Sequence, residues 1–252
     1  METEYTRETA LSYLARLLRD PDEQTEQMVR DRDGVYRVYG RLFGPDNLDS
    51  LRSEDLIGFL LYENNRHWWG IHRHQKKLVA DMEHTRAVFR RLLDESEPIV
   101  DRLDWIEGND GCKPLPGLGK AVYTPTLHVV YPDRYGVWNS IAESAMRRLT
   151  LWPALDRGWT FGQQYEAVNA VLHEVPGQLD TDLWTVDSFW WRVEREAEPT
   201  KHQDPGLGSG GGSGPGRRNA YRMEQFTCTS CWTTKPVNLQ AREGEDLCVD
   251  CA

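Results

Sequence analysis

The chain has 252 residues, of which 39% are hydrophobic and 28% charged, and its formal net charge is −10. This length suffices for one good-sized core and a small extra module. There is no run of about 18 apolar residues, and the N-terminus is charged from the start, so we expect a cytoplasmic protein without a membrane span or secretion signal.

Apolar residues recur at helical spacing through most of the first 200 residues, and this pattern predicts a mostly α-helical body over 1–202. The helices expected in chain order are 6–20, a helix capped by Ser53, an uninterrupted helix over 76–96, 140–152 and 160–175. The aromatic-rich segment 182–196 is expected to close the core as a helix or a strand.

The segment 62–77, YENNRHWWGIHRHQKK, interleaves basic and aromatic residues. Such a composition suits stacking on an unpaired or flipped base and clamping of its backbone. The candidate DNA contacts here are Asn64, Asn65, Arg66, Trp68 and Arg73. In the alternative interpretation, Trp68 and Trp69 are core or half-core residues and the polar residues cap a helix end.

Positive charge is concentrated in two stretches despite the acidic average. Residues 66–91 carry seven basic against two acidic side chains, and residues 111–150 carry five against two. Two such stretches are compatible with one DNA-facing surface, although ordinary solvated helix faces are an equal alternative.

Residues 114–140, PLPGLGKAVYTPTLHVVYPDRYGVWNS, predict a helix, a tight glycine hairpin and a second helix. Gly117 and Gly119 can take positive φ, and the helix N-terminus that follows suits a phosphate oxygen, with Lys120 adding positive charge. The spacing of a nucleotide-binding P-loop is missing, so nucleoside triphosphate binding is not predicted. Pro125 indicates that the second helix starts late or kinks.

This segment resembles the helix-hairpin-helix segment of the DNA glycosylase superfamily, in which a Leu-Pro-Gly-x-Gly hairpin holds DNA phosphate through backbone amides. The resemblance implies a glycosylase-like helical body and DNA contacts at Gly117, Leu118, Gly119 and Lys120. In the bifunctional members of that family, a lysine just after the hairpin attacks the sugar. The resemblance therefore implies catalytic roles for Lys120 and for Asn139, which follows it by 19 residues and stands where the family has an aspartate.

Two departures from the family bear on catalysis. Asn139 cannot accept a proton, and Lys120 stands one place earlier than usual. Asp133 and Glu143 are the two candidates for an acid that replaces the aspartate. In the structural alternative, Lys120 binds phosphate, Asn139 caps a helix and Asp133 forms a turn. Three functions stay open. The first is a DNA repair protein that excises or recognises a modified or damaged base, and the second is a non-catalytic DNA-binding adaptor or regulator that recruits a protein partner. The third is a protein-binding scaffold without DNA affinity.

The last 50 residues predict a flexible Gly/Ser linker over 203–220 and a small module over 221–252. Cys228, Cys231, Cys248 and Cys251 form two C-x-x-C pairs with 16 residues between them, which predicts a closed, structural Zn²⁺ site with four thiolate ligands. The module resembles a zinc-ribbon domain of unknown function found in actinobacteria, and this resemblance implies the ribbon fold and a bacterial source. Its acidic second half favours a protein partner at least as much as DNA.

Overall fold

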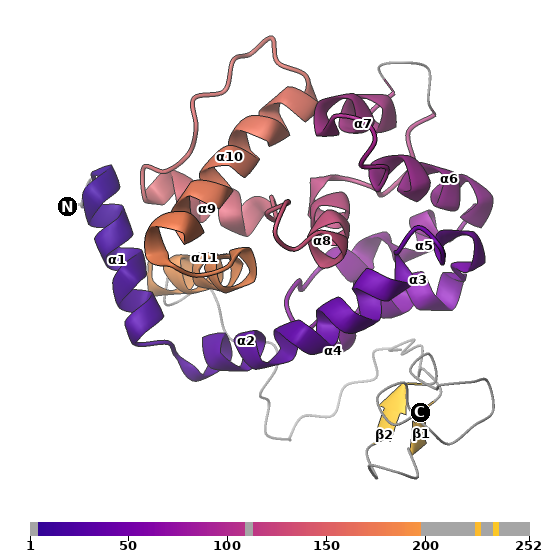
Figure 1. The fold of residues 1–252 in the computed structure, drawn as a ribbon, viewed down its shortest axis with the longest axis horizontal. Helices are drawn as coiled ribbons and strands as arrows, with labels where there is room; N and C mark the ends of the chain where they lie inside the picture. Colours follow the sequence, from indigo (N-terminus) through magenta and orange to yellow (C-terminus); the bar gives the residue numbers. More distant parts are fainter. Residues whose placement is uncertain (1–4, 109–112, 198–224, 228–233, 237–252) are drawn as a thin grey trace, which may run out of the picture. The chain divides into compact units, whose positions relative to one another are not determined.

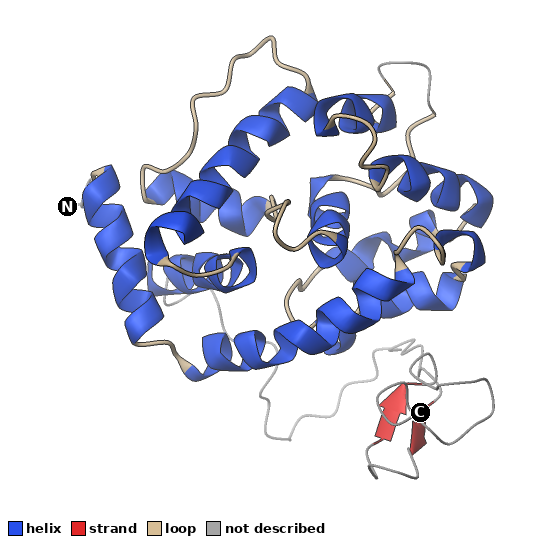
Figure 2. Ribbon diagram, viewed as in Figure 1, coloured by secondary structure: helices blue, strands red, loops and turns tan. Residues whose placement is uncertain are grey.

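The computed structural model describes residues 5–108, 113–197, 225–227 and 234–236. The chain divides into two compact units, Met1–Lys201 and His202–Ala252. Within the described residues of the first unit, all regular structure is helical (Figures 1 and 2), which confirms the predicted mostly α-helical body. None of the helices described there is long and apolar enough to cross a bilayer.

The helices of the first unit follow one another through the chain. The α-helices are α1 (Arg7–Arg19), α2 (Glu23–Val35), α3 (Ser53–Leu60), α4 (Tyr62–Asn65), α5 (Gln75–Leu78), α6 (Met82–Leu92), α7 (Ile99–Ile106), α8 (Lys120–Val130), α9 (Ser140–Arg148), α10 (Phe161–Leu179) and α11 (Leu183–Ala197). Segments with other helical geometry are the π-helix η1 (Tyr36–Gly40) and the 3-10 helices η2 (Leu48–Ser50) and η3 (Ile71–His74).

Side-chain caps define where several of these helices begin. Thr6 forms a capping box with Thr9 ahead of α1, and Thr160 forms one with Gln163 ahead of α10. Each box satisfies amides at the helix N-terminus that have no partner inside the helix. The helices predicted at 6–20, 140–152 and 160–175 are present as α1, α9 and α10, and the segment 182–196, expected as a helix or a strand, is the helix α11.

The uninterrupted helix predicted over 76–96 is wrong, because the chain turns between α5 and α6. Asp81 caps α6 by accepting the His84 N–H at 3.0 Å, and the Thr85 hydroxyl donates to the Leu78 carbonyl at 2.6 Å. These two bonds satisfy backbone groups at the break, so a separate helix begins at Met82.

Two further expectations about helix starts need correction. Ser53 is the first residue of α3 rather than its cap; Arg52 is the N-cap, and its N–H donates to the Asp55 carboxylate at 3.1 Å. Helix α8 starts at Lys120 and continues through Pro125, so it does not start late. A proline lacks the N–H that would bond four residues back and its ring crowds that carbonyl, yet the helix runs on from Pro125 to Val130.

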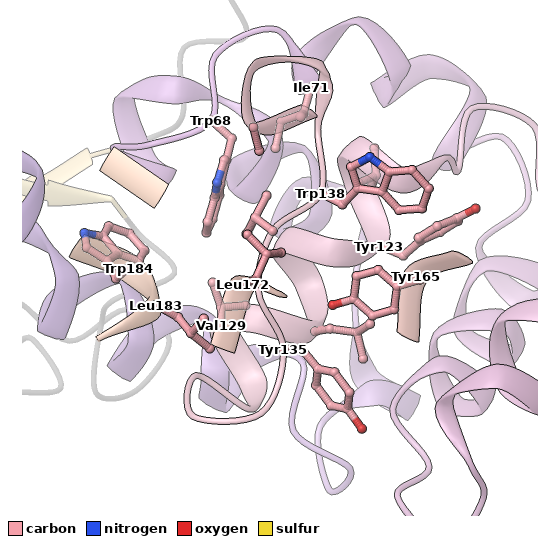
Figure 3. Packing of buried hydrophobic residues seen from close by; sticks show 14 of the residues in the cluster. Trp68, Ile71, Tyr123, Val129, Tyr135, Trp138, Tyr165, Leu172, Leu183 and Trp184 are labelled. Carbon is pink, nitrogen blue, oxygen red and sulfur yellow. The ribbon is translucent and has the colours of Figure 1, made fainter. Parts of the chain in front are cut away.

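The core is rich in aromatic side chains. Trp184 and Trp190 of α11 are fully buried, and α11 packs against α2 and α9. Figure 3 shows Tyr123, Trp138 and Tyr165 on one side of Leu172, with Trp184 on the other. Aromatic residues bury large areas and therefore dominate the stability of such a core.

Helices α7 and α10 cross closely at Gly162. A Cβ atom on Gly162 would lie 2.4 Å from the Val100 carbonyl oxygen, so no side chain fits there. The Gly162 N–H donates to the Asp104 carboxylate at 2.8 Å, which fixes the start of α10 against α7.

In the second unit, strands β1 (Gln225–Thr227) and β2 (Thr234–Pro236) pair antiparallel, with Phe226 opposite Lys235. The predicted linker over 203–220 and the four predicted zinc ligands lie outside the described residues.

Candidate nucleic-acid interface

The predicted hairpin lies between α7 and α8 and turns at Gly117, whose φ is +87°. Leu115 and Leu118 are buried, and the Leu118 N–H donates to the Leu115 carbonyl at 3.1 Å. Gly119 has an extended backbone with φ −132°, so only Gly117 of the two glycines uses a positive φ. The hairpin is therefore held in the core by Leu115 and Leu118, and its chain turns at Gly117.

Helix α8 begins directly after this turn without a side-chain cap. Gly119 is its N-cap residue, and within the described residues no side chain bonds to this helix end and no acidic residue stands in its first turn. The first turn of α8 thus supplies no carboxylate of its own to the positive end of the helix dipole. Such a helix end binds anions, phosphate among them.

Gly117 packs directly against the basic segment that precedes it in the sequence by about 40 residues. A Cβ atom on Gly117 would lie 3.1 Å from Lys77 Cβ and 3.4 Å from His74 Cβ. The hairpin and the η3–α5 segment are therefore in contact, and parts of the two basic stretches lie on one surface.

Several cations on this surface have no carboxylate partner in the part of the chain that the structure describes. Arg73, Lys76 and Lys77 are exposed, and no carboxylate among the described residues pairs with any of them. Burial lowers the pKa of His74, and neighbouring positive charges, chiefly Lys77 and then Arg73, lower it further. Burial is the larger cause of this lowered pKa, and the contribution of Lys77 and Arg73 shows that His74 lies among positive charges, a setting that favours an anionic ligand.

Two of the predicted DNA contacts, Asn65 and Trp68, lie in the core. The Asn65 side chain accepts the His67 and Trp68 N–H groups at 2.9 and 2.7 Å and donates to the Phe59 and Trp68 carbonyls at 3.0 and 3.2 Å. Trp68 is 4% exposed, and its Nε1 donates to the Asp187 carboxylate at 2.9 Å. Because their polar groups are satisfied inside the protein, these two residues are structural, as the alternative interpretation expected.

The other predicted contacts in this segment lie nearer the surface. Asn64 is half-buried, and its amide donates to the Gly58 carbonyl at 2.9 Å. Arg66 is exposed and ends α4 in the left-handed conformation, with φ 60°. Trp69, which is not among the predicted DNA contacts and is core or half-core in the alternative interpretation, is 52% exposed, and the Arg73 guanidinium lies 5.4 Å from its ring centroid. The exposed tryptophan of the pair is therefore Trp69 and not Trp68.

Lys120 is held by residues of the segment that follows α8. Its Nζ donates to the Glu143 carboxylate at 2.7 Å and lies 4.2 Å from the centroid of the Trp138 ring. Glu143 also accepts from Trp138 Nε1 at 3.1 Å and from Arg147 at 3.0 Å. Burial by itself raises the pKa of Glu143, but the hydrogen bonds from Lys120 and Trp138 outweigh it and hold the pKa below its ordinary value.

Asn139 lies next to Trp138 and therefore close to Lys120, but its side chain has a structural role. Its Oδ1 accepts the Ala142 N–H at 2.9 Å and caps α9. Of the two acids considered as replacements for an aspartate, Glu143 contacts Lys120, whereas Asp133 lies in an exposed turn after α8. No sequence pattern links Lys120 to Glu143, since the two come from different helices joined by a loop.

Comparison with protein-family models, with curated proteins and with solved structures finds no match. The two family resemblances of the sequence stay predictions.

Within the described residues, no group of three or more His, Cys, Asp or Glu side chains is placed to hold a metal ion. The segment 228–233, which connects the paired strands β1 and β2, contains Cys228 and Cys231. Both cysteines lie outside the described residues, so the zinc site stays a prediction.

Proposed function

We propose that the helical body binds DNA through a surface formed by the hairpin 115–120 and the basic segment 73–77. The observation that carries this proposal is the contact of Gly117 with Lys77 and His74. This contact joins an uncapped helix N-terminus to cations that have no carboxylate partner among the described residues. A polyanion neutralises both features at once.

In this proposal the DNA backbone supplies the anion. One phosphate lies against the first amides of α8, and neighbouring phosphates contact Lys76 and Lys77. Such contacts position a duplex and carry no sequence information, so the affinity depends strongly on salt and weakly on sequence. The net charge of −10 does not oppose this mode, because screening limits distant acids to a range of about 8 Å at physiological salt.

The test compares two charge-matched double variants for binding to a labelled duplex. Lys76→Ala with Lys77→Ala removes two proposed phosphate contacts and weakens binding by about 10-fold or more. The control, Arg19→Ala with Arg157→Ala, removes two exposed arginines that are not part of the proposed surface, and it changes the affinity by less than about twofold. Equal losses in both variants, or no duplex binding by the wild type, would overturn the proposal.

The contact between Lys120 and Glu143 favours base excision as a second candidate function. For a lysine to act as nucleophile it must first lose its proton, and Glu143, at 2.7 Å, is placed to accept it. The neutral amine then bonds to the anomeric carbon of the sugar as the bond from sugar to base breaks, and the departing base takes up a proton. Asn139 has no proton-accepting part in this scheme, because its side chain caps α9.

Borohydride trapping distinguishes excision from binding alone. Duplexes with modified or damaged bases are incubated with the protein and borohydride, which reduces the imine formed between lysine and sugar. A covalent band that disappears in Lys120→Ala and Glu143→Gln but persists in Lys113→Ala supports excision. Duplex binding with neither a band nor base release excludes it and leaves the non-catalytic function.

For the second unit we propose a structural Zn²⁺ bound by Cys228, Cys231, Cys248 and Cys251. The support is the chemistry of four cysteines in two C-x-x-C pairs and the position of the first pair between β1 and β2. When bound, such an ion supplies folding energy rather than catalysis, because thiolates fill all four positions. The acidic residues among these cysteines suit a protein partner, which this unit recruits to the DNA-bound body.

A further inference from the structure

Trp69 is exposed in a way that the core does not explain. It is 52% exposed, and the other exposed large hydrophobic residue among those described, Trp159, is 38% exposed. The preceding residue, Trp68, is buried. A single exposed aromatic ring is ordinary on a protein surface, so what points to a ligand is the setting of this ring beside Arg73 and His72.

The turn that presents Trp69 is rigidly built. The buried Asn65 amide accepts from and donates to the backbone of Trp68, and Trp68 is anchored through its Nε1 to Asp187. Gly70 follows with φ +92°, a conformation that a residue with a side chain rarely adopts. These contacts fix the backbone on both sides of Trp69, so little conformational freedom is lost when its ring binds a partner.

The environment of the Trp69 ring is cationic. The Arg73 guanidinium lies 5.4 Å from its centroid, and the His72 ring meets it edge-on at 5.9 Å. Arg73 begins the same basic segment that contacts Gly117 of the hairpin through His74 and Lys77. Trp69 therefore stands at the border of the proposed DNA surface.

We infer that Trp69 stacks on an unpaired base of DNA bound at this surface. The inference rests on the proposed DNA-binding function and names its substrate class as duplex DNA with an adjacent unpaired base. A base in an intact duplex shows no free face to a tryptophan, whereas an unpaired base stacks on it whatever its sequence. Arg73 pairs with the phosphate of that nucleotide while it stays over the indole.

The experiment measures the affinity for a blunt duplex and for the same duplex with a short single-stranded overhang. The first overhang base is 2-aminopurine, whose fluorescence falls when it stacks. We expect the wild type to prefer the overhang DNA by about 5- to 150-fold, the range for stacking of one base on an aromatic side chain. The 2-aminopurine signal falls on binding.

The variants separate stacking from general DNA binding. Trp69→Ala abolishes the preference and the fluorescence change while its affinity for the blunt duplex stays within about twofold, and Trp69→Phe keeps most of both. Trp159→Ala, which removes the other exposed tryptophan, behaves like the wild type. A midpoint temperature of unfolding of Trp69→Ala close to that of the wild type shows that the fold is intact.

The outcomes tell the two proposals apart. If the wild type binds both DNAs equally, or if Trp69→Ala keeps the preference, the stacking inference is overturned while duplex binding through Lys76 and Lys77 stands. Absence of binding to either DNA overturns the proposed function and the inference with it. A single-stranded oligonucleotide without any duplex is the third arm, and binding equal to that of the overhang DNA would overturn the requirement for an adjacent duplex.

Discussion

A buried carboxylate, Asp187, organises the residues around the turn that presents Trp69. His67 Nε2 lies 2.7 Å from Asp187 Oδ2, and Trp68 Nε1 donates to the same oxygen at 2.9 Å. The side chains of His67 and Asp187 are 3% and 6% exposed. Polar groups at such depth are costly unless they are paired, so these residues depend on one another.

Replacement of Asp187 by Ala leaves the polar atoms of His67 and Trp68 unpaired in the core. We expect the free energy of unfolding to fall by about 3 to 5 kcal/mol. Urea unfolding followed by tryptophan fluorescence measures this loss. Asp133→Ala, which removes an exposed carboxylate from a turn, is the control and changes stability by less than about 0.5 kcal/mol. A loss for Asp187→Ala as small as that of the control would contradict the structural role of the buried pair.

His128 is fully buried in its neutral form. Its Nδ1 donates to the Tyr135 carbonyl at 2.7 Å, and its Nε2 accepts from the Tyr36 hydroxyl at 2.9 Å. Burial lowers the pKa of His128 from 6.5 to about 4, although the hydrogen bond to Tyr135 acts in the opposite direction. The folded protein therefore takes up a proton at this residue less readily than the unfolded chain does.

This lowered pKa makes stability depend on pH between 6.5 and about 4. Above pH 6.5 the stabilisation is fully present; as the pH falls toward 4, the unfolded chain binds a proton that the folded protein excludes, and stability is lost. When the pH falls from about 7.5 to about 5, we expect the free energy of unfolding of the wild type to decrease by about 2 kcal/mol more than that of His128→Gln. Urea unfolding at both pH values tests this, and an equal loss in the two proteins would exclude His128 as the cause.

At the scale of elements, two glycines of α10 make a matched pair. Gly162 lies where a Cβ atom would be 2.4 Å from the Val100 carbonyl oxygen of α7, whereas nothing lies within 4 Å of a Cβ on Gly177. Both positions have ordinary helical backbone, so the crossing with α7 alone distinguishes them.

Gly162→Ala forces α7 and α10 apart and is expected to cost about 3 kcal/mol of stability. Gly177→Ala lowers the conformational entropy of the unfolded chain at an exposed helical position and is expected to stabilise the protein by about 0.5 kcal/mol. Thermal unfolding of the two variants gives shifts of opposite sign. Shifts of the same sign would mean that the α7–α10 crossing is looser than the structure has it.

Regular leucine spacing was enough to predict α1, but other elements lack such a clear sequence pattern. Helix α2 has a strongly polar sequence, EQTEQMVRDRDGV, with little apolar periodicity, and it is helical because α11 packs against it. The break between α5 and α6 is hidden because Leu78 and Met82 keep helical spacing across it. Packing against α11 decides in the first case, whereas the cap at Asp81 and the Thr85 hydrogen bond decide at the break; apolar spacing alone reveals neither.

In the candidate site, too, some features follow from local sequence and others depend on residues far along the chain. The hairpin turn and the cap at Asn139 follow from local sequence, since glycine and asparagine have marked backbone and capping preferences. The burial of Trp68 and the exposure of Trp69 do not, because the partner that anchors Trp68 is Asp187, far along the chain. Likewise, the contact of Lys120 with Glu143 requires the positions of two helices.

At the scale of the whole molecule, the second unit differs from the body in the chemistry that we propose for it. We expect the purified protein to contain about one Zn²⁺ per chain, because two C-x-x-C pairs supply the four ligands of a closed site. Elemental analysis by mass spectrometry measures the ratio. Cys248→Ser with Cys251→Ser brings it close to zero, and Cys112→Ser, outside both pairs, leaves it unchanged. A zinc content that survives the double variant would contradict the proposed ligand set.

The charge of the whole chain and the charge of the proposed surface have opposite signs. The chain carries −10, yet Arg73, Lys76 and Lys77 lie beside the hairpin without carboxylate partners among the described residues. This separation of charge favours a localised contact with a polyanion over general adhesion to it. Binding of that kind has a defined number of phosphate contacts and hence a defined dependence on salt.

The most direct test of this account is the affinity for a short duplex measured between about 50 and 200 mM salt, for the wild type and for Lys76→Ala with Lys77→Ala. The account predicts that the logarithm of the wild-type association constant falls steeply and linearly with the logarithm of the salt concentration. The double variant has a slope that is smaller by about 2, one unit for each lost phosphate contact. A wild-type affinity that does not depend on salt, or a slope that the double variant leaves unchanged, would contradict DNA binding through this surface.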